Sequence, residues 1–210
     1  MPARPAWRSI GLAGVVCVLC LGAWCVVTPA RAQNSSPGTF ANGPALVEFV
    51  HECVRARTGG DTCPIGKDQF ALRAYVDLPD IAERVGGGIW QKASPPERER
   101  FLELVAGIVQ QEITETFGDR SVIVKSERAL PGGEMLVAGE YTAKNDRATR
   151  LSWLIGRKAD RMLLKDISVD GISFVVAARD QIQTLAAEAD GSLDSLIAII
   201  RKRYVRPVRP

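Results

Sequence analysis

The sequence predicts an α+β domain in which an antiparallel sheet of about four strands packs against helices at one face. Residues 94–117 carry apolar side chains at helical spacing along one stripe, as expected for a helix that packs on a core. Residues 120–169 then divide into four short segments with strand character, and the turns between them are short enough to join antiparallel neighbours. A run of strands flanked by helices is typical of the α+β class.

The helices predicted before the sheet rest on apolar periodicity and on breaker residues. A first helix is expected from about residue 44 to residue 57, and the Thr-Gly-Gly-Asp segment at 58–61 ends it. Two short helical regions are expected at residues 70–75 and 79–85. The three glycines at 86–88 then predict a hinge before the next helix.

The long helix has the clearest start. Ser94 precedes it, Pro95 stands at the first helical position and Glu97 at the third, a combination that caps free amides and presets the backbone. We expect this helix to end at Gly118. The strands are expected at about residues 120–129, 134–144, 148–157 and 161–169. A turn at 170–173 and two further helices complete the domain.

The N-terminus predicts export. Residues 1–32 have a positive start, an apolar run and an Ala-Arg-Ala cleavage site, which are the parts of a secretory signal peptide, so we expect cleavage after Ala32. An uncleaved anchor is the alternative, because the apolar run approaches the ~20 residues of a membrane-spanning helix. Residues 33–43 are rich in Asn, Ser, Pro and Gly and predict a flexible leader. A single domain at 44–203 and a basic tail at 204–210 follow.

The charge balance argues against nucleic acid as a partner. Three of the 27 Lys and Arg residues lie in the signal peptide, so 24 remain against 24 Asp and Glu, and the mature chain is formally neutral. A neutral domain lacks the basic surface that nucleic-acid binding needs. Five basic residues gather at 201–210. They either contact anionic headgroups or a partner protein, or belong to a fraying terminus, and the sequence leaves both open.

The two cysteines of the mature chain, Cys53 and Cys63, predict a disulfide, because an even pair in an oxidising compartment pairs readily. Closing a loop of this size adds about 2.7 kcal/mol in the chain-entropy model. A functional thiol pair is the alternative, although nine intervening residues are far from a redox C-x-x-C motif.

Catalytic and metal sites find little support in the sequence. His51 is the single histidine, so any Ser-His or Cys-His arrangement would have to include it. The HExxH zinc motif needs a second histidine where Arg55 stands, so we predict neither a metal site nor catalytic residues. Asp166 ends a predicted strand beside the helix that carries Arg179, and we expect these two to form a buried ion pair with a structural role.

Two blocks of the sequence match a known pattern. The first has Gly-x-Trp, Ala-Ser, Glu-Arg and Phe between Gly88 and Phe101. The second, residues 163–203, is an apolar strand that ends in Asp166, then a turn and two helices. Together they resemble the MlaC-like toluene-tolerance family of periplasmic phospholipid-binding proteins. Met162 stands where many members have Trp, which also allows the hopanoid-associated HpnM branch, whose ligand is a polycyclic lipid.

The resemblance implies an NTF2-like cone of sheet and helices around an apolar cavity. It also implies a periplasmic, monomeric carrier without a cofactor, which shuttles phospholipid between an outer-membrane lipoprotein complex and an inner-membrane ABC transporter with a lipid-binding ring. The residues expected at the cavity are Val105, Ile108, Val109, Val122, Val124, Val137, Tyr141, Leu151, Trp153, Leu164, Ile167, Val169, Phe174, Val175 and Ile182.

Two rival functions remain open at this stage. An exported NTF2-like enzyme would bring Asp166, Tyr141 and His51 together at one pocket. A structural adaptor would have a filled core, which the apolar stripes alone predict equally well, since every globular domain has them.

Overall fold

The computed structural model describes residues 39–59, 63–66, 71–118, 120–142 and 147–204. Its elements are α1 (Gly43–Arg57), η1 (Leu72–Ala74), α2 (Leu78–Lys92), α3 (Pro95–Phe117), β1 (Ser121–Ala129), η2 (Pro131–Gly133), β2 (Met135–Thr142), β3 (Thr149–Lys158), β4 (Arg161–Val169), β5 (Ile172–Ser173), α4 (Phe174–Glu188) and α5 (Leu193–Tyr204). The expected signal peptide at 1–32, most of the leader and the tail beyond Tyr204 lie outside the described residues. None of the described helices is long and apolar enough to cross a membrane.

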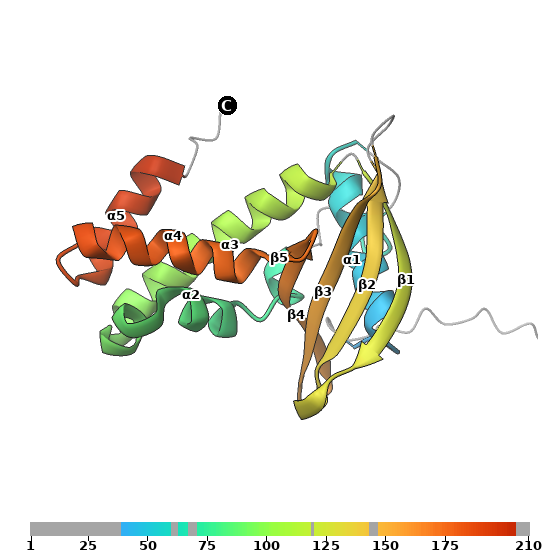
Figure 1. Cartoon of the computed structure of the whole chain (residues 1–210), viewed down its shortest axis with the longest axis horizontal. Coiled ribbons are helices and arrows are strands. Elements are labelled where there is room, and N and C mark those ends of the chain that lie inside the picture. The colour runs from blue at the N-terminus through green and yellow to red at the C-terminus, as the bar shows by residue number, and fades with distance from the viewer. Residues whose placement is uncertain (1–38, 60–62, 67–70, 119, 143–146, 205–210) are drawn as a thin grey trace, which may run out of the picture. The chain divides into compact units, whose positions relative to one another are not determined.

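The five strands form one antiparallel meander in the order β1-β2-β3-β4-β5 (Figure 1), which confirms the predicted α+β class. The expected turn at 170–173 includes the short strand β5. Asp170 and Gly171 both have positive φ, as in the Asp-Gly turns of tight hairpins. Lys125 in β1 and Lys165 in β4 are the unpaired residues of two β-bulges, which increase the local twist and re-aim the side chains that follow.

Helix α1 packs directly on β1 and β2 (Figure 1). A Cβ atom at Gly43 would lie 2.6 Å from Val137 Cγ2, so the helix starts as close to the sheet as a glycine allows. Leu46 and Ile155 are fully buried beside it. The predicted disulfide between Cys53 and Cys63 is present and ties the end of α1 to the following segment.

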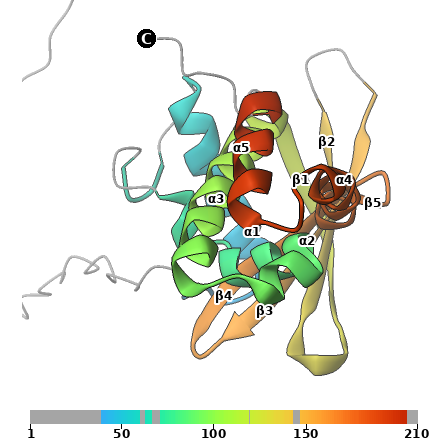
Figure 2. The same cartoon turned by 90° about the vertical axis from the view of Figure 1, so that its left-hand side faces the viewer.

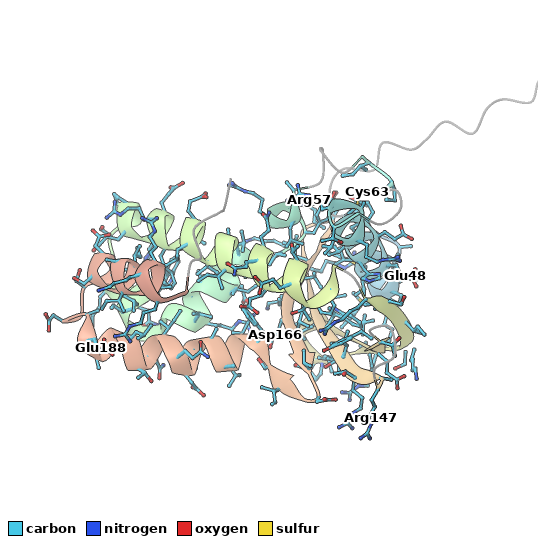
Figure 3. All side chains as sticks on the ribbon, turned by 90° about the horizontal axis from the view of Figure 1, so that it is seen from above. Glu48, Arg57, Cys63, Arg147, Asp166 and Glu188 are labelled. Carbon is cyan, nitrogen blue, oxygen red and sulfur yellow. A yellow bond between two sulfur atoms is a disulfide. The ribbon has the colours of Figure 1, made fainter. Side chains whose placement is uncertain are left out.

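Helices α2 to α5 form a second layer beside β4 (Figure 1 and Figure 2). Within it α2 contacts α3 and α4, while α5 contacts α3 and α4. The core of this layer is built from large side chains such as Trp90, Phe101, Leu196 and Ile200, all buried. Figure 3 places Asp166 where the sheet meets these helices and Glu188 at their far end.

The expected hinge at 86–88 is present as a kink within α2: the backbone of Gly87 is not helical, and helical structure resumes beyond it up to Lys92. Gly87 has a φ of 51°, a conformation that favours glycine. Gly86 is buried, and a Cβ atom there would lie 2.8 Å from Trp90 Cβ. The glycines thus interrupt the regular helix at a kink and let α2 approach its neighbours closely.

Candidate functional site

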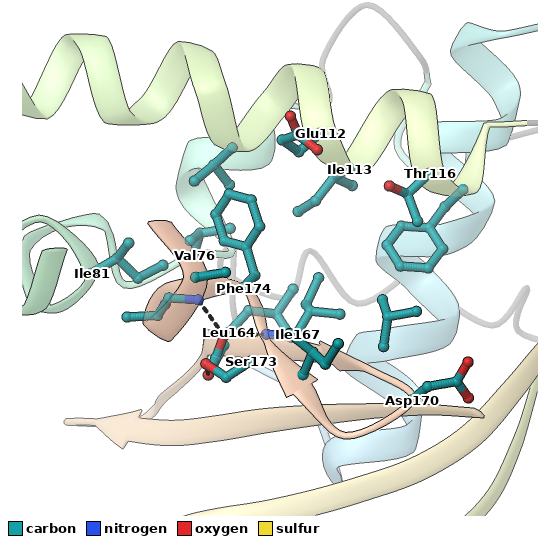
Figure 4. Close-up of a pocket in the computed structure, with 17 residues that line it drawn as sticks. Val76, Ile81, Glu112, Ile113, Thr116, Leu164, Ile167, Asp170, Ser173 and Phe174 are labelled. Carbon is teal, nitrogen blue, oxygen red and sulfur yellow. Dashed lines mark hydrogen bonds between the residues drawn. The ribbon is translucent and has the colours of Figure 1, made fainter. Parts of the chain in front are cut away.

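An apolar cavity of about 410 Å³, here called cavity A, lies between the C-terminal part of α3 and the segment β4-β5-α4 (Figure 4). Most of its lining is hydrocarbon. The lining residues are Val76, Ile81, Val109, Glu112, Ile113, Thr116, Phe117, Leu164, Asp166, Ile167, Val169, Asp170, Ile172, Ser173, Phe174, Val175 and Ala177. This volume falls within the 300–1,000 Å³ that small-molecule sites commonly have, roughly at the lower end of that range.

The start of α4 forms one wall of cavity A and is held by a hydrogen-bond network around Asp166. The Asp166 carboxylate accepts hydrogen bonds from Ser173 Oγ and from the backbone N–H of Val175 at 3.1 Å (Figure 4). Ser173 Oγ in turn accepts from the N–H of Val176 at 3.0 Å, as an N-cap does. Free amides of the first helical turn are thereby satisfied, and the helix start is fixed to β4.

The expected ion pair between Asp166 and Arg179 is therefore wrong. Both residues lie in the described part of the chain, and no ion pair joins them there; Arg179 is exposed. A helix N-terminus offers N–H donors at short range, and they stabilise a carboxylate without a distant guanidinium. The expectation that the strand ends in Asp166 is also wrong, because β4 continues to Val169, and sequence reasoning missed Ser173, the partner of Asp166 seven residues later.

The bulge residue Lys165 attaches β4 to α2 and to Glu134, the residue before β2. Its ammonium lies 2.6 Å from Glu134 Oε1 and 3.3 Å from Asp80 Oδ1. The hydrogen bond to Glu134 is the main reason that the pKa of Lys165 is raised. Arg84 of α2 also donates to the Lys165 carbonyl. These contacts secure the strand on which Leu164, Ile167 and Val169 line the cavity.

A second cavity of about 290 Å³, here called cavity B, lies among α3, α4 and α5. It is lined by Ile108, Gln111, Glu112, Phe174, Ala177, Ala178, Gln181, Ile182, Leu185 and Ile200. It shares Glu112, Phe174 and Ala177 with cavity A. A much smaller space of about 20 Å³ lies on the side of α1 and shares Ile113, Phe117, Leu164 and Ile167 with cavity A.

The residues expected at the cavity from sequence lie at cavity A, at cavity B, at the small space or at none of the three. Cavity A is lined by Val109, Leu164, Ile167, Val169, Phe174 and Val175. Cavity B is lined by Ile108 and Ile182, together with Phe174, and the small space by Val122 and Trp153. The structure places none of the remaining five at these spaces: Val105, Val124, Val137, Tyr141 and Leu151.

Several lining residues of cavity A were not expected from sequence. Ile113 and Phe117 continue the stripe of α3 at intervals of four residues from Val109, so extending that stripe would have found them. Val76 had no comparable local signal. It reaches the cavity because its backbone forms a parallel bridge with Leu164, a contact between distant segments.

The three residues of the enzyme alternative do not share one cavity. Asp166 lines cavity A, His51 lines the small space and Tyr141 lines neither. His51 Nε2 donates to the Arg120 carbonyl at 2.7 Å, and burial lowers the pKa of the imidazole. The Arg120 guanidinium lies over the Tyr141 ring, with its Cζ atom 4.6 Å from the ring centroid. Across the described ranges, no three His, Cys, Asp or Glu side chains form a group that could hold a metal ion.

Comparisons with known proteins agree with this architecture. The model of the MlaC protein family matches residues 69–202, and a search of curated proteins found no match. A solved structure with the same fold is a phospholipid-binding protein from Ralstonia solanacearum in complex with a phospholipid; the TM-score is 0.61 and the identity 15%, over 76% of this chain and 93% of that one. The family match spans more than half of the sequence and confirms the resemblance drawn from its two blocks. This chain belongs to the MlaC family.

Proposed function

We propose that this protein is a periplasmic lipid carrier that encloses acyl chains of a glycerophospholipid in cavity A. The observation that carries the proposal is the apolar cavity of about 410 Å³ between α3 and β4-β5-α4. The structurally similar Ralstonia protein is described as a phospholipid-binding protein in complex with a phospholipid. A carrier of this kind would collect lipid at one membrane-bound complex and deliver it to another.

The physical argument concerns acyl chains in water. Each methylene removed from water contributes about 0.8 kcal/mol, so a sixteen-carbon chain gains on the order of 12 kcal/mol from complete enclosure. A site of this kind needs shape and apolar surface, whereas the headgroup can remain in water. The lining of cavity A has this composition, with polar side chains such as Asp170 and Glu112 that are exposed at its rim.

The partners and the compartment are part of the same proposal. The N-terminal pattern predicts export, and the disulfide between Cys53 and Cys63 suits an oxidising compartment such as the periplasm. The carrier would exchange lipid with an outer-membrane lipoprotein complex and an inner-membrane ABC transporter that has a lipid-binding ring. Transport energy would come from that transporter, so the carrier itself would need neither cofactor nor catalytic residues.

The test uses mature protein purified from its own periplasm, with native mass spectrometry and lipid extraction. We expect close to one diacyl phospholipid for each chain. Val169→Arg places a charge in cavity A and should abolish lipid retention. Ser168→Arg is the matched control, because successive residues of a strand point to opposite faces of the sheet, and it should retain lipid.

The outcomes separate the alternatives. A hopanoid in place of phospholipid would assign the protein to the hopanoid carriers. Protein without lipid, which also takes up none from vesicles of phosphatidylethanolamine, would contradict the carrier proposal and favour a structural adaptor. Equal retention by folded Val169→Arg and wild type would place the lipid outside cavity A.

A further inference from the structure

Phe174 stands where cavity A and cavity B meet. It is the first residue of α4, and its side chain lines both cavities. Figure 4 shows this side chain reaching from the start of α4 toward α3. The ring is only partly buried. The two cavities therefore adjoin across one aromatic side chain.

The backbone around Phe174 is fixed, whereas its side chain packs against the core and also borders the two cavities. Asp166 and Ser173 hold the amides of Val175 and Val176. None of the ring contacts found among the described residues involves Phe174. The next turn of α4 presents the small side chain of Ala177 to both cavities. Rotation about the side-chain torsions can therefore move the ring without moving the helix.

We propose that cavity B is a second acyl-chain site, and that the Phe174 ring determines whether it opens to cavity A. This inference rests on the proposed lipid-carrier function. The two chains of a diacyl lipid diverge from one glycerol unit, so their sites must adjoin at one end, as the two cavities do. With the ring between them, cavity A accepts one chain; with the ring turned aside, both chains of one lipid are enclosed.

The lining of cavity B fits an acyl chain. Its interior is formed by Ile108, Ile182, Leu185 and Ile200, which are buried or half-buried hydrocarbon. Glu112, which borders both cavities, is exposed and marks the side of the junction that faces water. The glycerol and headgroup would therefore lie near Glu112 while the chains enter on either side of Phe174.

The experiment compares one-chain and two-chain lipids on the mature protein after removal of bound lipid. The probes are dipalmitoyl phosphatidylethanolamine and its lyso form, which has one palmitoyl chain, titrated by native mass spectrometry. Ala178→Phe fills cavity B, since Ala178 lines that cavity and not cavity A. Ala187→Phe is the matched control, because Ala187 is exposed on the same helix and lines neither.

We expect Ala178→Phe to weaken binding of the diacyl lipid by about tenfold or more and to leave the lyso lipid within about twofold. Ala187→Phe should change neither affinity. Phe174→Ala removes the dividing ring and should load the diacyl lipid several-fold faster. Gln181→Trp, at the exposed rim of cavity B, is a second way to fill it if Ala178→Phe does not fold.

Equal weakening of both lipids, or of neither, in folded filling variants would overturn the second-chain site. Slower loading in Phe174→Ala would overturn the role of the ring. If wild type binds neither probe, the carrier function itself fails, and the inference fails with it. If wild type binds both probes while the filling variants bind as wild type does, the carrier function stands and this inference alone is wrong.

Discussion

The two halves of α3 carry the same kind of apolar stripe but face different interiors. In the first half, residues 95–105, Phe101 and Leu104 are buried, and the Trp90 ring centroid lies 6.0 Å from that of Phe101. In the second half, residues 106–117, Ile113 and Phe117 are buried to a similar degree, yet they line cavity A. Low exposure of a side chain thus does not indicate whether the space beside it is filled.

The difference comes from the elements that face the helix. The first half lies against α2 and α5, where Arg98 donates to the Trp90 carbonyl and Arg100 pairs with Asp194. The second half faces β4, β5 and the start of α4, and the Asp166 network fixes that start to the strand. The hydrogen bonds of Asp166 and the side-chain ion pairs of Lys165 therefore hold β4 and the start of α4 in place around this space.

Truncation of a phenylalanine in each half tests this difference directly. Phe101→Ala should lower the free energy of unfolding by about 3–5 kcal/mol, because it opens a void in a filled core. The loss of unfolding free energy in Phe117→Ala should be smaller than in Phe101→Ala, by at least about 1 kcal/mol, since a side chain that borders a cavity has fewer packed atoms around it. Urea unfolding followed by circular dichroism measures both.

The pair also has a functional readout. Phe101→Ala should keep the lipid affinity of wild type while it remains folded, whereas Phe117→Ala should change that affinity because it alters the wall of cavity A. Equal losses of stability with unchanged lipid binding in both variants would show that the two halves do not differ in packing.

Local sequence patterns were sufficient for the secondary structure and the order of the strands. The cap at Ser94 and Glu97 is present, and α3 ends at Phe117, next to the predicted stop at Gly118. The glycine triplet of α2 correctly indicated an interruption, which is the kink at Gly87, but it did not indicate that Gly86 allows close packing. What those glycines contact depends on distant helices, which local propensity does not report.

The cavity was harder to predict than the fold. Val105 and Val109 are one turn apart on the same stripe, and only Val109 lines cavity A. Val137 and Leu151 are buried as lining residues would be, but they line none of the three spaces. Periodicity identifies which face of an element is buried. It does not indicate how far away the opposing element lies, which long-range contacts such as the bridge between Val76 and Leu164 decide.

The Asp166 network is the next feature to test, because it holds the wall opposite the second half of α3. Asp166→Asn keeps one acceptor oxygen but cannot accept from both Ser173 Oγ and the Val175 amide as the carboxylate does. We expect a loss of about 1–2 kcal/mol in the free energy of unfolding, the usual effect of removing a helix cap. Lipid retention should fall as well, since the position of Phe174 depends on this cap.

Asp180→Asn is the control for the cap, because Asp180 is exposed on the same helix and its carboxylate takes no part in the hydrogen bonds around Asp166. This variant should match wild type in stability and in lipid retention. A loss of stability in Asp166→Asn without any change in lipid retention would show that the cap does not maintain cavity A.

The smallest expected effect is a pH dependence of stability that comes from His51 of α1, beside the second half of α3. His51 lines the small space with Ile113 and Phe117 and donates to the Arg120 carbonyl. Burial is the main reason that the pKa of His51 is lowered, and nearby Arg55 lowers it further. A folded-state pKa below the unfolded value of about 6.5 means that protonation favours the unfolded chain. Stability should therefore fall as the pH drops below about 6.5, by no more than about 1.4 kcal/mol for each pH unit.

His51→Gln isolates this effect, because a glutamine amide can still donate to the Arg120 carbonyl and does not titrate. Urea midpoints at about pH 7.5 and about pH 5.5 should differ less for this variant than for wild type. The same difference in both proteins would assign the pH dependence to carboxylates elsewhere. A smaller difference in the variant would show that the packing between α1 and α3 disfavours a charged imidazole at His51. Cavity A, on the opposite side of Phe117, is by contrast an open space.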